Sequence, residues 1–333
     1  MQAIFAVTIP FFALVLLGWF AARAHWLPES AIPGLNAYVL FFALPCMLFR
    51  FGSSLAVGRL ADPALLATYV IAALAIIALT IALTLRRPGR AGGVDLRDAA
   101  FGALVAAFPN AGFMGVPLLV ALLGDAAAGP VIGAILVDLV VTSTLCLALA
   151  QSHSHRAGAA DERRAPAKAA ALSLRSALTN PLPWAIALGA GFAATNRELP
   201  GPIAQIVRML GDSATPVALF TIGTVLWRAG QHVHTRTPVA QYLPVALIKL
   251  FVHPALVFAI GSAARALGAP VSPFGLMVLT LTAALPSASN ASLLAERYGA
   301  DNGRIARIIM ASTVLAFATF SAAAWLFGVG TAE

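Results

Sequence analysis

Long apolar runs without charged residues dominate this sequence, and their length constrains the fold more than any other feature. A helix needs ~20 apolar residues to span a bilayer, and runs of about this length follow one another along most of the 333 residues. Only 10% of the residues are charged and 60% are hydrophobic, whereas roughly 25% of a soluble domain is charged. We therefore expect an all-α membrane protein, and we expect its first run to be retained because no cleavage site follows it.

Ten runs are candidate transmembrane helices, of which the sixth is short and the seventh contains Asp212. In chain order they are Ala3–Ala22, Ala31–Phe49, Pro63–Leu85, Ala99–Gly124, Ala126–Ala150, Pro181–Thr195, Met209–Trp227, Pro238–Ala264, Ala266–Ala295 and Ile305–Val329. The longest hydrophilic stretch separates the fifth run from the sixth, and its composition is typical of a surface linker. We assign residues 151–180 to this linker.

Basic residues are distributed unevenly between the loops, and this indicates how the chain is oriented. Loops after odd-numbered runs carry 15 Lys and Arg residues, and loops after even-numbered runs carry 5. Cytoplasmic loops are enriched in basic residues, so we expect an inner-membrane protein with both termini periplasmic and the central linker cytoplasmic. The same clustering accounts for the net charge of +8 without nucleic acid as a partner.

The two halves of the chain share a pattern that indicates an internal duplication. Residues 1–150 and 181–333 each contain five runs, and the second and seventh runs each carry an internal proline, Pro45 and Pro216. The fourth and ninth runs are both interrupted by proline, small residues and an asparagine. A unit with an odd number of crossings forces its copy to enter from the opposite face. We therefore expect two inverted five-helix repeats, as in many secondary transporters.

The fourth run contains the segment AAFPNAGFMGVPLL (Ala106–Leu119), which would break a helix where unpaired backbone groups cost most. A half-helix that starts there carries roughly half a positive charge and free N–H groups at its N-terminal end. Two such ends brought together would form an anion site, with Asn110 and Asn290 capping the freed groups. The alternative is that proline and glycine only kink two packed helices.

Three segments resemble a known family. Asn36–Pro45 (NAYVLFFALP), Pro109–Pro117 (PNAGFMGVP) and Leu285–Ala291 (LPSASNA) are similar to segments of the auxin efflux carrier family, which includes plant auxin carriers and bacterial carriers of malonate and similar acids. The resemblance covers nearly the whole chain. It implies ten helices with crossed, unwound fourth and ninth helices, a fold similar to that of sodium/bile-acid symporters.

The resemblance also implies how such a protein moves. Helices 1, 2, 6 and 7 would form a scaffold, and helices 3–5 and 8–10 a mobile transport domain that works as an elevator; a homodimer through the scaffold would suit this motion. This chain departs from the family pattern at Ala111, where members often carry a hydroxyl residue. It also lacks the long hydrophilic loop of many plant members, so neither a hydroxyl ligand there nor loop-based regulation is carried over.

The two interruptions and the charges inside the runs supply the candidate site residues. For an organic anion these are Pro109, Asn110, Ala111 and Gly112 of the fourth run, Pro286, Ser287, Ser289 and Asn290 of the ninth, Lys249 of the eighth and Asn36 of the second. For a coupling ion or proton they are Asp138 of the fifth run and His253, one turn after Lys249.

Each of these intramembrane groups has a second interpretation that the sequence leaves open. Lys249 and Asp138 serve a substrate and a coupling ion, or they form a fixed ion pair, or they bond to backbone groups that the interruptions free. His253 is a proton carrier or a packed, hydrogen-bonded side chain. Thr142, Ser143 and Thr144 contribute hydroxyl ligands or bond within their own helix.

Together these features predict a secondary transporter of a small organic anion such as malonate or malate, coupled to protons, to sodium or to no ion. The alternative is a sodium/proton-coupled cation exchanger or a bile-acid-type symporter on the same fold. An exchanger would concentrate carboxylates at the interruptions, but Asp138 is the only acidic residue well inside a run. The sequence carries no enzyme motif and predicts no cofactor and no metal site, since nothing completes a site around His153 and His155.

Overall fold

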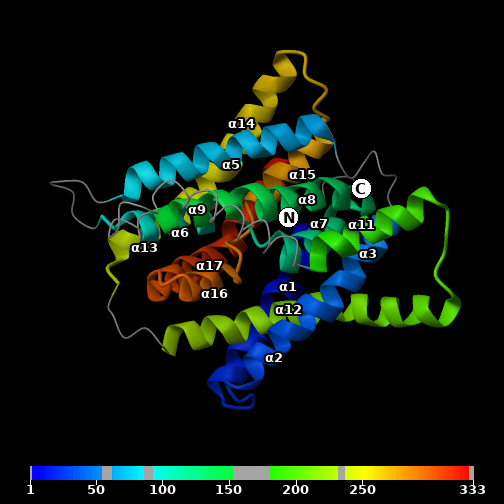
Figure 1. The fold of residues 1–333 in the computed structure, drawn as a ribbon, viewed down its shortest axis with the longest axis horizontal. Coiled ribbons are helices and arrows are strands. Elements are labelled where there is room, and N and C mark those ends of the chain that lie inside the picture. The colour runs from blue at the N-terminus through cyan, green and yellow to red at the C-terminus, as the bar shows by residue number, and fades with distance from the viewer. Residues whose placement is uncertain (1, 55–61, 86–92, 153–180, 232–236, 330–333) are drawn as a thin grey trace, which may run out of the picture.

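Helices make up nearly all of the computed structural model of this protein, which describes residues 2–54, 62–85, 93–152, 181–231 and 237–329 (Figure 1). Within these ranges no strand forms, and paired extended backbone is limited to two isolated bridges. The all-α fold class predicted from the sequence is therefore confirmed. The histidine pair of the linker lies outside the described residues.

Seven helical stretches of the described chain are long and apolar enough to cross a membrane. They are α1 (Gln2–Arg23); α2, η1 and α3 in succession (Ala31–Tyr38, Val39–Ala43, Leu44–Ser54); α5 (Pro63–Thr84); η3, α8, η4 and α9 (Asp125–Ala127, Ala128–Val137, Asp138–Thr142, Ser143–Ser152); α12 (Gly201–Gln231); α13, η5 and α14 (Val239–Leu247, Ile248–Val252, His253–Ala266); and α17 (Asn302–Leu326). They correspond to the first, second, third, fifth, seventh, eighth and tenth predicted runs.

The other three runs form shorter helices. The fourth is divided into α6 (Leu96–Ala107), η2 (Ala111–Gly115) and α7 (Val116–Leu123), the sixth is α11 (Pro181–Ala194), and the ninth is divided into α15 (Pro273–Ala283) and α16 (Ala291–Arg297). The fourth and ninth runs are thus interrupted at the proline-containing segments where the sequence predicts a break. Ten membrane crossings stay a prediction, because only seven stretches of the described chain reach the spanning length.

The predicted start of the ninth run was wrong. Ala266 is the last residue of α14, and the chain turns at Gly268, whose φ of 89° lies in the left-handed region that ends many helices. The new helix begins only at Pro273, a residue favoured at the first helical position. The Ser272 hydroxyl caps it by accepting a 3.0 Å hydrogen bond from the Gly275 amide.

Several arginines that the sequence assigned to loops lie inside helices, Arg208 and Arg304 among them. Arg208 belongs to α12, which starts earlier than the predicted seventh run. Arg304 lies in the first turn of α17 and is only 1% exposed. Its Nε donates to the Gln241 carbonyl at 2.9 Å, and its Nη1 donates to the Asp98 carbonyl at 2.8 Å. This one guanidinium therefore joins the N-terminal ends of α6, α13 and α17.

Glycine lets α1 and α12 approach until their backbones touch. A Cβ atom on Gly18 would overlap the Phe220 carbonyl oxygen, and a Cβ on Gly223 would overlap the Val15 carbonyl oxygen. The contact is reciprocal, since each helix presents a glycine to a carbonyl of the other. Small residues at helix interfaces allow close packing of this kind where no hydrophobic effect draws the helices together.

The same arrangement recurs between α3 and α11. A Cβ atom on Gly52 would crowd the Ile186 carbonyl oxygen, and one on Gly189 would overlap the Phe49 carbonyl oxygen. The second and sixth runs, in α3 and α11, therefore pack against each other in the same way as the first and seventh runs, in α1 and α12. Together with α2 and η1, which also contact α12, these helices form the group that we call the first body.

The remaining helices surround α6 and form a second body. α6 packs against α5 and α9, while α14 packs against α5 and α15. Every residue of α6 from Ala99 to Ala107 is buried, and five of the nine are alanine, so neighbouring helices can come close. We call α5 to α9 together with α13 to α17 the second body.

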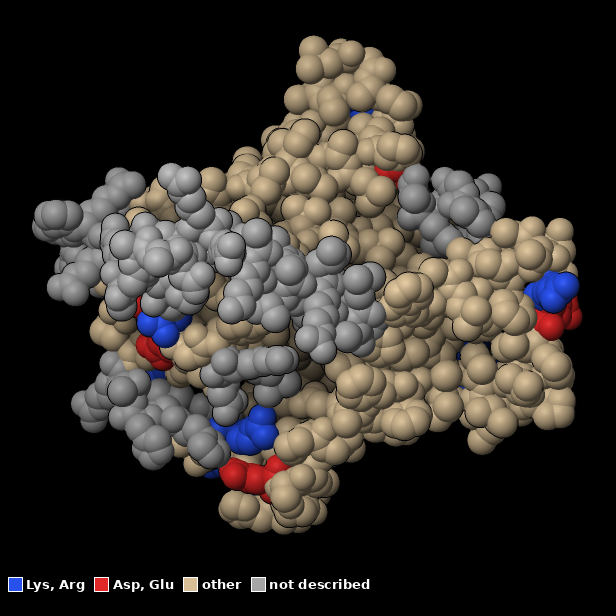
Figure 2. Space-filling view, viewed as in Figure 1, with Lys and Arg blue, Asp and Glu red and all other residues tan. Residues whose placement is uncertain are grey.

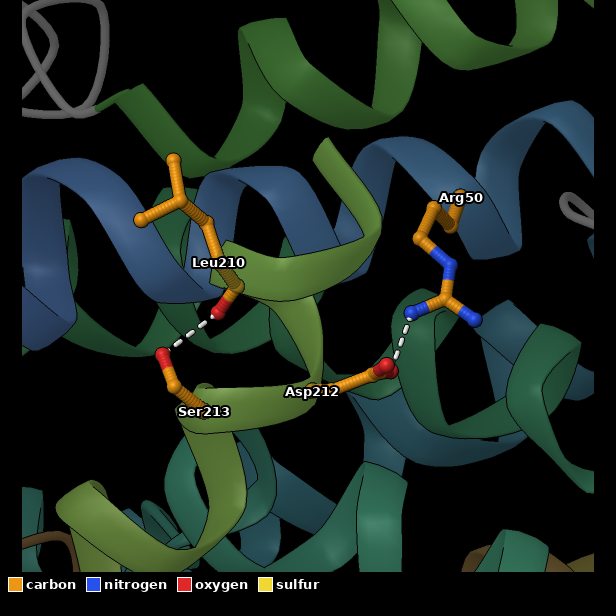
Figure 3. Close-up of polar contacts among 4 residues, drawn as sticks. All are labelled: Arg50, Leu210, Asp212 and Ser213. Atoms are coloured by element: carbon orange, nitrogen blue, oxygen red, sulfur yellow. Dashed lines mark hydrogen bonds and ion pairs between the residues drawn. The ribbon is translucent and has the colours of Figure 1, made fainter. Parts of the chain in front are cut away.

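Charged side chains are sparse on the surface, and an ion pair joins two helices of the first body, α3 and α12. On the face drawn in Figure 2 they are confined to a few places, and large apolar side chains such as Leu16 and Trp184 are more than half exposed, as a lipid-facing surface requires. Asp212, which weakened the seventh run, forms an ion pair with Arg50, with 2.5 Å between Oδ1 and Nη1 (Figure 3). The next residue of α12, Ser213, has its hydroxyl 2.7 Å from that of Tyr38.

We expect Gly189→Ala to lower the melting temperature of the detergent-purified protein, because its Cβ overlaps the Phe49 carbonyl and overpacking of this kind costs about 1–3 kcal/mol. Gly191→Ala is the matched control on the same helix, since a Cβ there meets nothing within 4 Å. Alanine is the better helix former, so the control should melt at or above the parent temperature. Equal melting temperatures for the two variants would contradict this packing.

Candidate functional site

The two helix interruptions lie side by side and pair through their backbones. Pro109 and Ser287 form an antiparallel bridge. The Asn110 amide donates to the Pro286 carbonyl at 2.8 Å, and the Ala288 amide donates to the Phe108 carbonyl at 3.0 Å. Breaks in runs that are far apart in the sequence therefore form one irregular element, and each satisfies polar backbone groups of the other.

A side chain from the ninth run repairs the defect that Pro109 creates in the fourth. In an uninterrupted helix the Val105 carbonyl would accept from the amide of residue 109, but proline has no N–H. The Ser287 hydroxyl donates to this carbonyl instead, at 2.7 Å, and the group is buried. The amide of Ser287 in turn donates to the Ser312 hydroxyl of α17 at 3.2 Å.

Lys249 repairs the corresponding defect at the end of α15. The Ala283 carbonyl would accept from the amide of residue 287 in a continuous helix, and that amide points to Ser312. The fully buried Lys249 donates to the Ala283 carbonyl at 2.6 Å, and its Nζ lies 3.2 Å from Nδ1 of His253, which is also buried. For Lys249 these contacts match the alternative in which it bonds to a backbone group that the interruption frees. For His253 they match a packed, hydrogen-bonded side chain.

Asp138 is held by hydroxyl groups and does not pair with Lys249. Its carboxylate is fully buried at the start of η4, a wide turn of the kind often found at functional sites. Oδ2 accepts from the Tyr69 hydroxyl of α5 and Oδ1 accepts from the Thr142 hydroxyl, both at 3.0 Å. The Ser143 hydroxyl donates to the Asp138 carbonyl at 2.8 Å. No ion pair joins Asp138 to Lys249 among the described residues, so the fixed ion pair was the wrong alternative.

The two asparagines do not cap helix ends with their side chains as expected. Asn110 is 3% exposed, and it is its backbone carbonyl that accepts from Met114 and Gly115, at 3.1 and 3.0 Å. The Oδ1 atom of Asn290 is buried and has no hydrogen-bond partner within the described chain. A buried acceptor without a partner costs free energy, so a water molecule or a ligand that donates a hydrogen bond to this atom would be stabilised there.

Asn290 lines a small pocket between the two bodies. The pocket is lined by Asn36 of α2, Val225 and Arg228 of α12, Phe113 of η2, and Ser289 and Asn290 of the segment between α15 and α16. Its cavity of about 10 Å³ has room for about one water molecule. Both interruptions contribute to it on one side, and the first body closes it on the other.

The structure thus brings together only some of the predicted site residues. Asn36, Ser289 and Asn290 share the pocket. Pro109, Asn110, Ala111, Pro286 and Ser287 are buried and are not among the pocket-lining residues. Gly112 is partly exposed, with open space where a Cβ would lie. Lys249, His253 and Asp138 lie inside the second body and are not among the pocket-lining residues.

Sequence reasoning missed Arg228. It counted this residue as a loop cation, because the predicted seventh run ends at Trp227. In the structure Arg228 lies in the last turns of α12, one helical turn after Val225, and both line the pocket. The three-residue spacing could have placed Arg228 on the helix face of Val225, but only with a longer seventh helix.

Comparisons with known proteins agree on the class of the chain. A family model described as membrane transport protein matches residues 3–326. A protein of Rhizobium meliloti (strain 1021) named "Putative malonate transporter" is 28% identical over 332 residues, which are 99% of this chain and 98% of the relative.

We expect Ser287→Ala to lower the melting temperature of the purified protein. The change leaves the Val105 carbonyl without a donor in a buried setting, which costs about 1–3 kcal/mol. Ser321→Ala is the matched control, because the buried Ser321 hydroxyl donates to Phe317 of its own helix, whose carbonyl lies in an intact helical turn. If both variants melt at the parent temperature, the hydroxyl does not repair the break.

Proposed function

The chain belongs to the auxin efflux carrier family of membrane transport proteins, and on this premise we propose that it is a secondary transporter of a small organic anion of the malonate or malate type. The printed name of the Rhizobium relative supports this class of cargo. Full coverage of both chains supports a similar overall organisation, while 28% identity leaves the particular acid to be measured.

One observation carries the proposal: two interrupted helices pair with each other beside a pocket that contains amide, hydroxyl and guanidinium groups. Irregular backbone inside an apolar protein is tolerated where it is buried or lines a cavity, and discontinuous helices form the substrate sites of many transporters. The cargo would bind to Asn290, Ser289 and Asn36, with the paired interruptions holding these groups in place.

We further propose that the chain forms two inverted five-helix repeats, residues 1–150 and 181–333, joined by the linker at 151–180. The reciprocal glycine contacts support this arrangement. Exchanging the first run with the sixth and the second with the seventh converts the α1–α12 contact into the α11–α3 contact. A two-fold relation between repeats has this consequence.

The two bodies suggest the mechanism. The first body contains runs 1, 2, 6 and 7 and would be the scaffold, and the second contains runs 3–5 and 8–10 and would be the transport domain. Because the pocket is lined by both bodies, an elevator movement of the second would carry bound cargo across the membrane and separate it from the scaffold side. A scaffold-mediated homodimer in the inner membrane, with periplasmic termini, would leave the transport domain free to move.

Asp138 is our candidate for coupling. Its buried carboxylate accepts from Tyr69 of α5 and Thr142 of η4, so protonation or sodium binding there would change contacts within the transport domain. His253 is the second candidate, through its contact with Lys249. A cation exchanger of the same fold would use these groups alone and would not need the pocket.

Proteoliposome flux tests the proposal. We expect the parent protein to take up labelled malonate, and we expect Asn290→Ala to lower uptake at low malonate about fivefold, the effect of losing one hydrogen bond of ~1 kcal/mol. Thr195→Ala is the control, since this exposed hydroxyl bonds only within its own end of α11.

The same vesicles separate the alternatives. Uptake is measured with a proton gradient, with a sodium gradient and with neither, so that coupling is read directly. Sodium-driven pH changes without flux of any small carboxylate would reject the anion transporter and support the exchanger.

A further inference from the structure

Among the described residues that line the pocket between the two bodies, one is a cation and none is acidic. Its polar lining residues are Asn36, Arg228, Ser289 and Asn290, and its apolar walls are Phe113 and Val225. Resting on the proposed function, we propose that Arg228 binds the carboxylate of the transported acid from the scaffold side. The proposal gives α12 a role in substrate recognition, whereas the sequence placed Arg228 in the loop after the seventh run.

An anion inside the membrane needs a compensating charge, and Lys249 is not placed to supply it in the pocket, which it does not line. An isolated carboxylate is costly to bury without a cationic partner. The ammonium group of Lys249 donates to the Ala283 carbonyl at 2.6 Å and does not line the pocket. Of the described residues that line the pocket, Arg228 alone carries a positive charge.

Arg228 also has neighbours that suit a carboxylate. Arg228 and Val225 lie one helical turn apart on α12, and Asn36 joins them from α2, so the first body presents a guanidinium beside an amide. A guanidinium offers parallel N–H groups that match the two oxygens of a carboxylate, which a lysine cannot do. The scaffold side of the pocket is therefore suited to a carboxylate.

The groups on the opposite side of the pocket indicate what the other end of the ligand must offer. Across the pocket, Oδ1 of Asn290 is a buried acceptor without a partner in the described chain, and the Ser289 hydroxyl donates or accepts beside it. A ligand group that donates a hydrogen bond would satisfy Asn290. The chemistry of the lining groups thus matches a short acid with one carboxylate and one donor, either a hydroxy acid or a dicarboxylic acid in its singly protonated form, which would enter once the two bodies separate.

A cation in the last turns of a helix also interacts favourably with the helix dipole, and this is the structural alternative for Arg228. Lysine would fill that role equally well, so the conservative variant distinguishes the two. A dipole role also predicts a change in stability alone, with no change in the preference between a charged and an uncharged ligand.

The experiment compares the parent with Arg228→Gln, Arg228→Lys and Arg208→Gln in proteoliposomes, using malonate as the transported acid and uncharged malonamide as a competitor. Arg208 lies on the same helix, is exposed and does not line the pocket. We expect Arg228→Gln to raise the KM for malonate about tenfold or more, the effect of losing a charge-assisted hydrogen bond. Arg228→Lys should raise it severalfold, and inhibition by malonamide should change little.

The outcomes separate this inference from the proposed function. If the parent carries no small carboxylate, the proposed function fails. If the parent carries malonate and both Arg228 variants keep its KM, the inference alone is overturned. It is also overturned if Arg228→Gln weakens the binding of malonate and of malonamide equally. A loss of the preference for malonate in Lys249→Met, and not in Arg228→Gln, would overturn it as well. Melting temperatures identify a variant that does not fold. If Arg228→Gln does not fold, the KM of Arg228→Lys for malonate decides between the two roles of Arg228.

Discussion

The need to hydrogen-bond every backbone group inside an apolar protein governs this structure. Two runs contain residues that cannot continue a helix, and each break frees carbonyl and amide groups that lipid or apolar side chains could not satisfy. The breaks satisfy each other through the Asn110–Pro286 and Ala288–Phe108 hydrogen bonds. Ser287 and Lys249 supply the donors that remain missing, to Val105 and Ala283. The irregular element is therefore held in a fixed conformation.

This fixed element lies at the boundary of two bodies that are packed differently. In the first body, glycines place helix backbones in direct contact at two related interfaces. In the second, an alanine-rich α6 is enclosed by its neighbours, and Arg304 joins three helix ends. The pocket between the bodies has room for about one water, so the proposed cargo would bind only if the bodies separated. Tight packing within each body and a small polar space between them would suit the elevator movement that we propose.

The polar residues around the interruptions divide into two groups by what they contact. Ser287 and Lys249 bond to backbone of the interruptions and so maintain the site without lining it. Arg228, Asn36, Ser289 and Asn290 line the pocket, and Asn290 carries an acceptor that the described chain leaves unused. Asp138 belongs to neither group, because hydroxyl donors surround it inside the second body. A substitution in the first group should alter stability, and one in the second should alter affinity.

The sequence by itself determined the helices and the places where two of them break, because apolar length and the chemistry of proline are local properties. It also singled out Asn36, Ser289 and Asn290, which line the pocket, since polar residues in apolar runs are conspicuous. Only the tertiary structure decided which groups Lys249 and Ser287 bond to and that Arg228 lines the pocket. The Ser287 hydroxyl and the Val105 carbonyl are 182 positions apart, and Lys249 meets Ala283 from a different helix. Which donor reaches a freed carbonyl depends on how helices pack, and no local pattern records that distance.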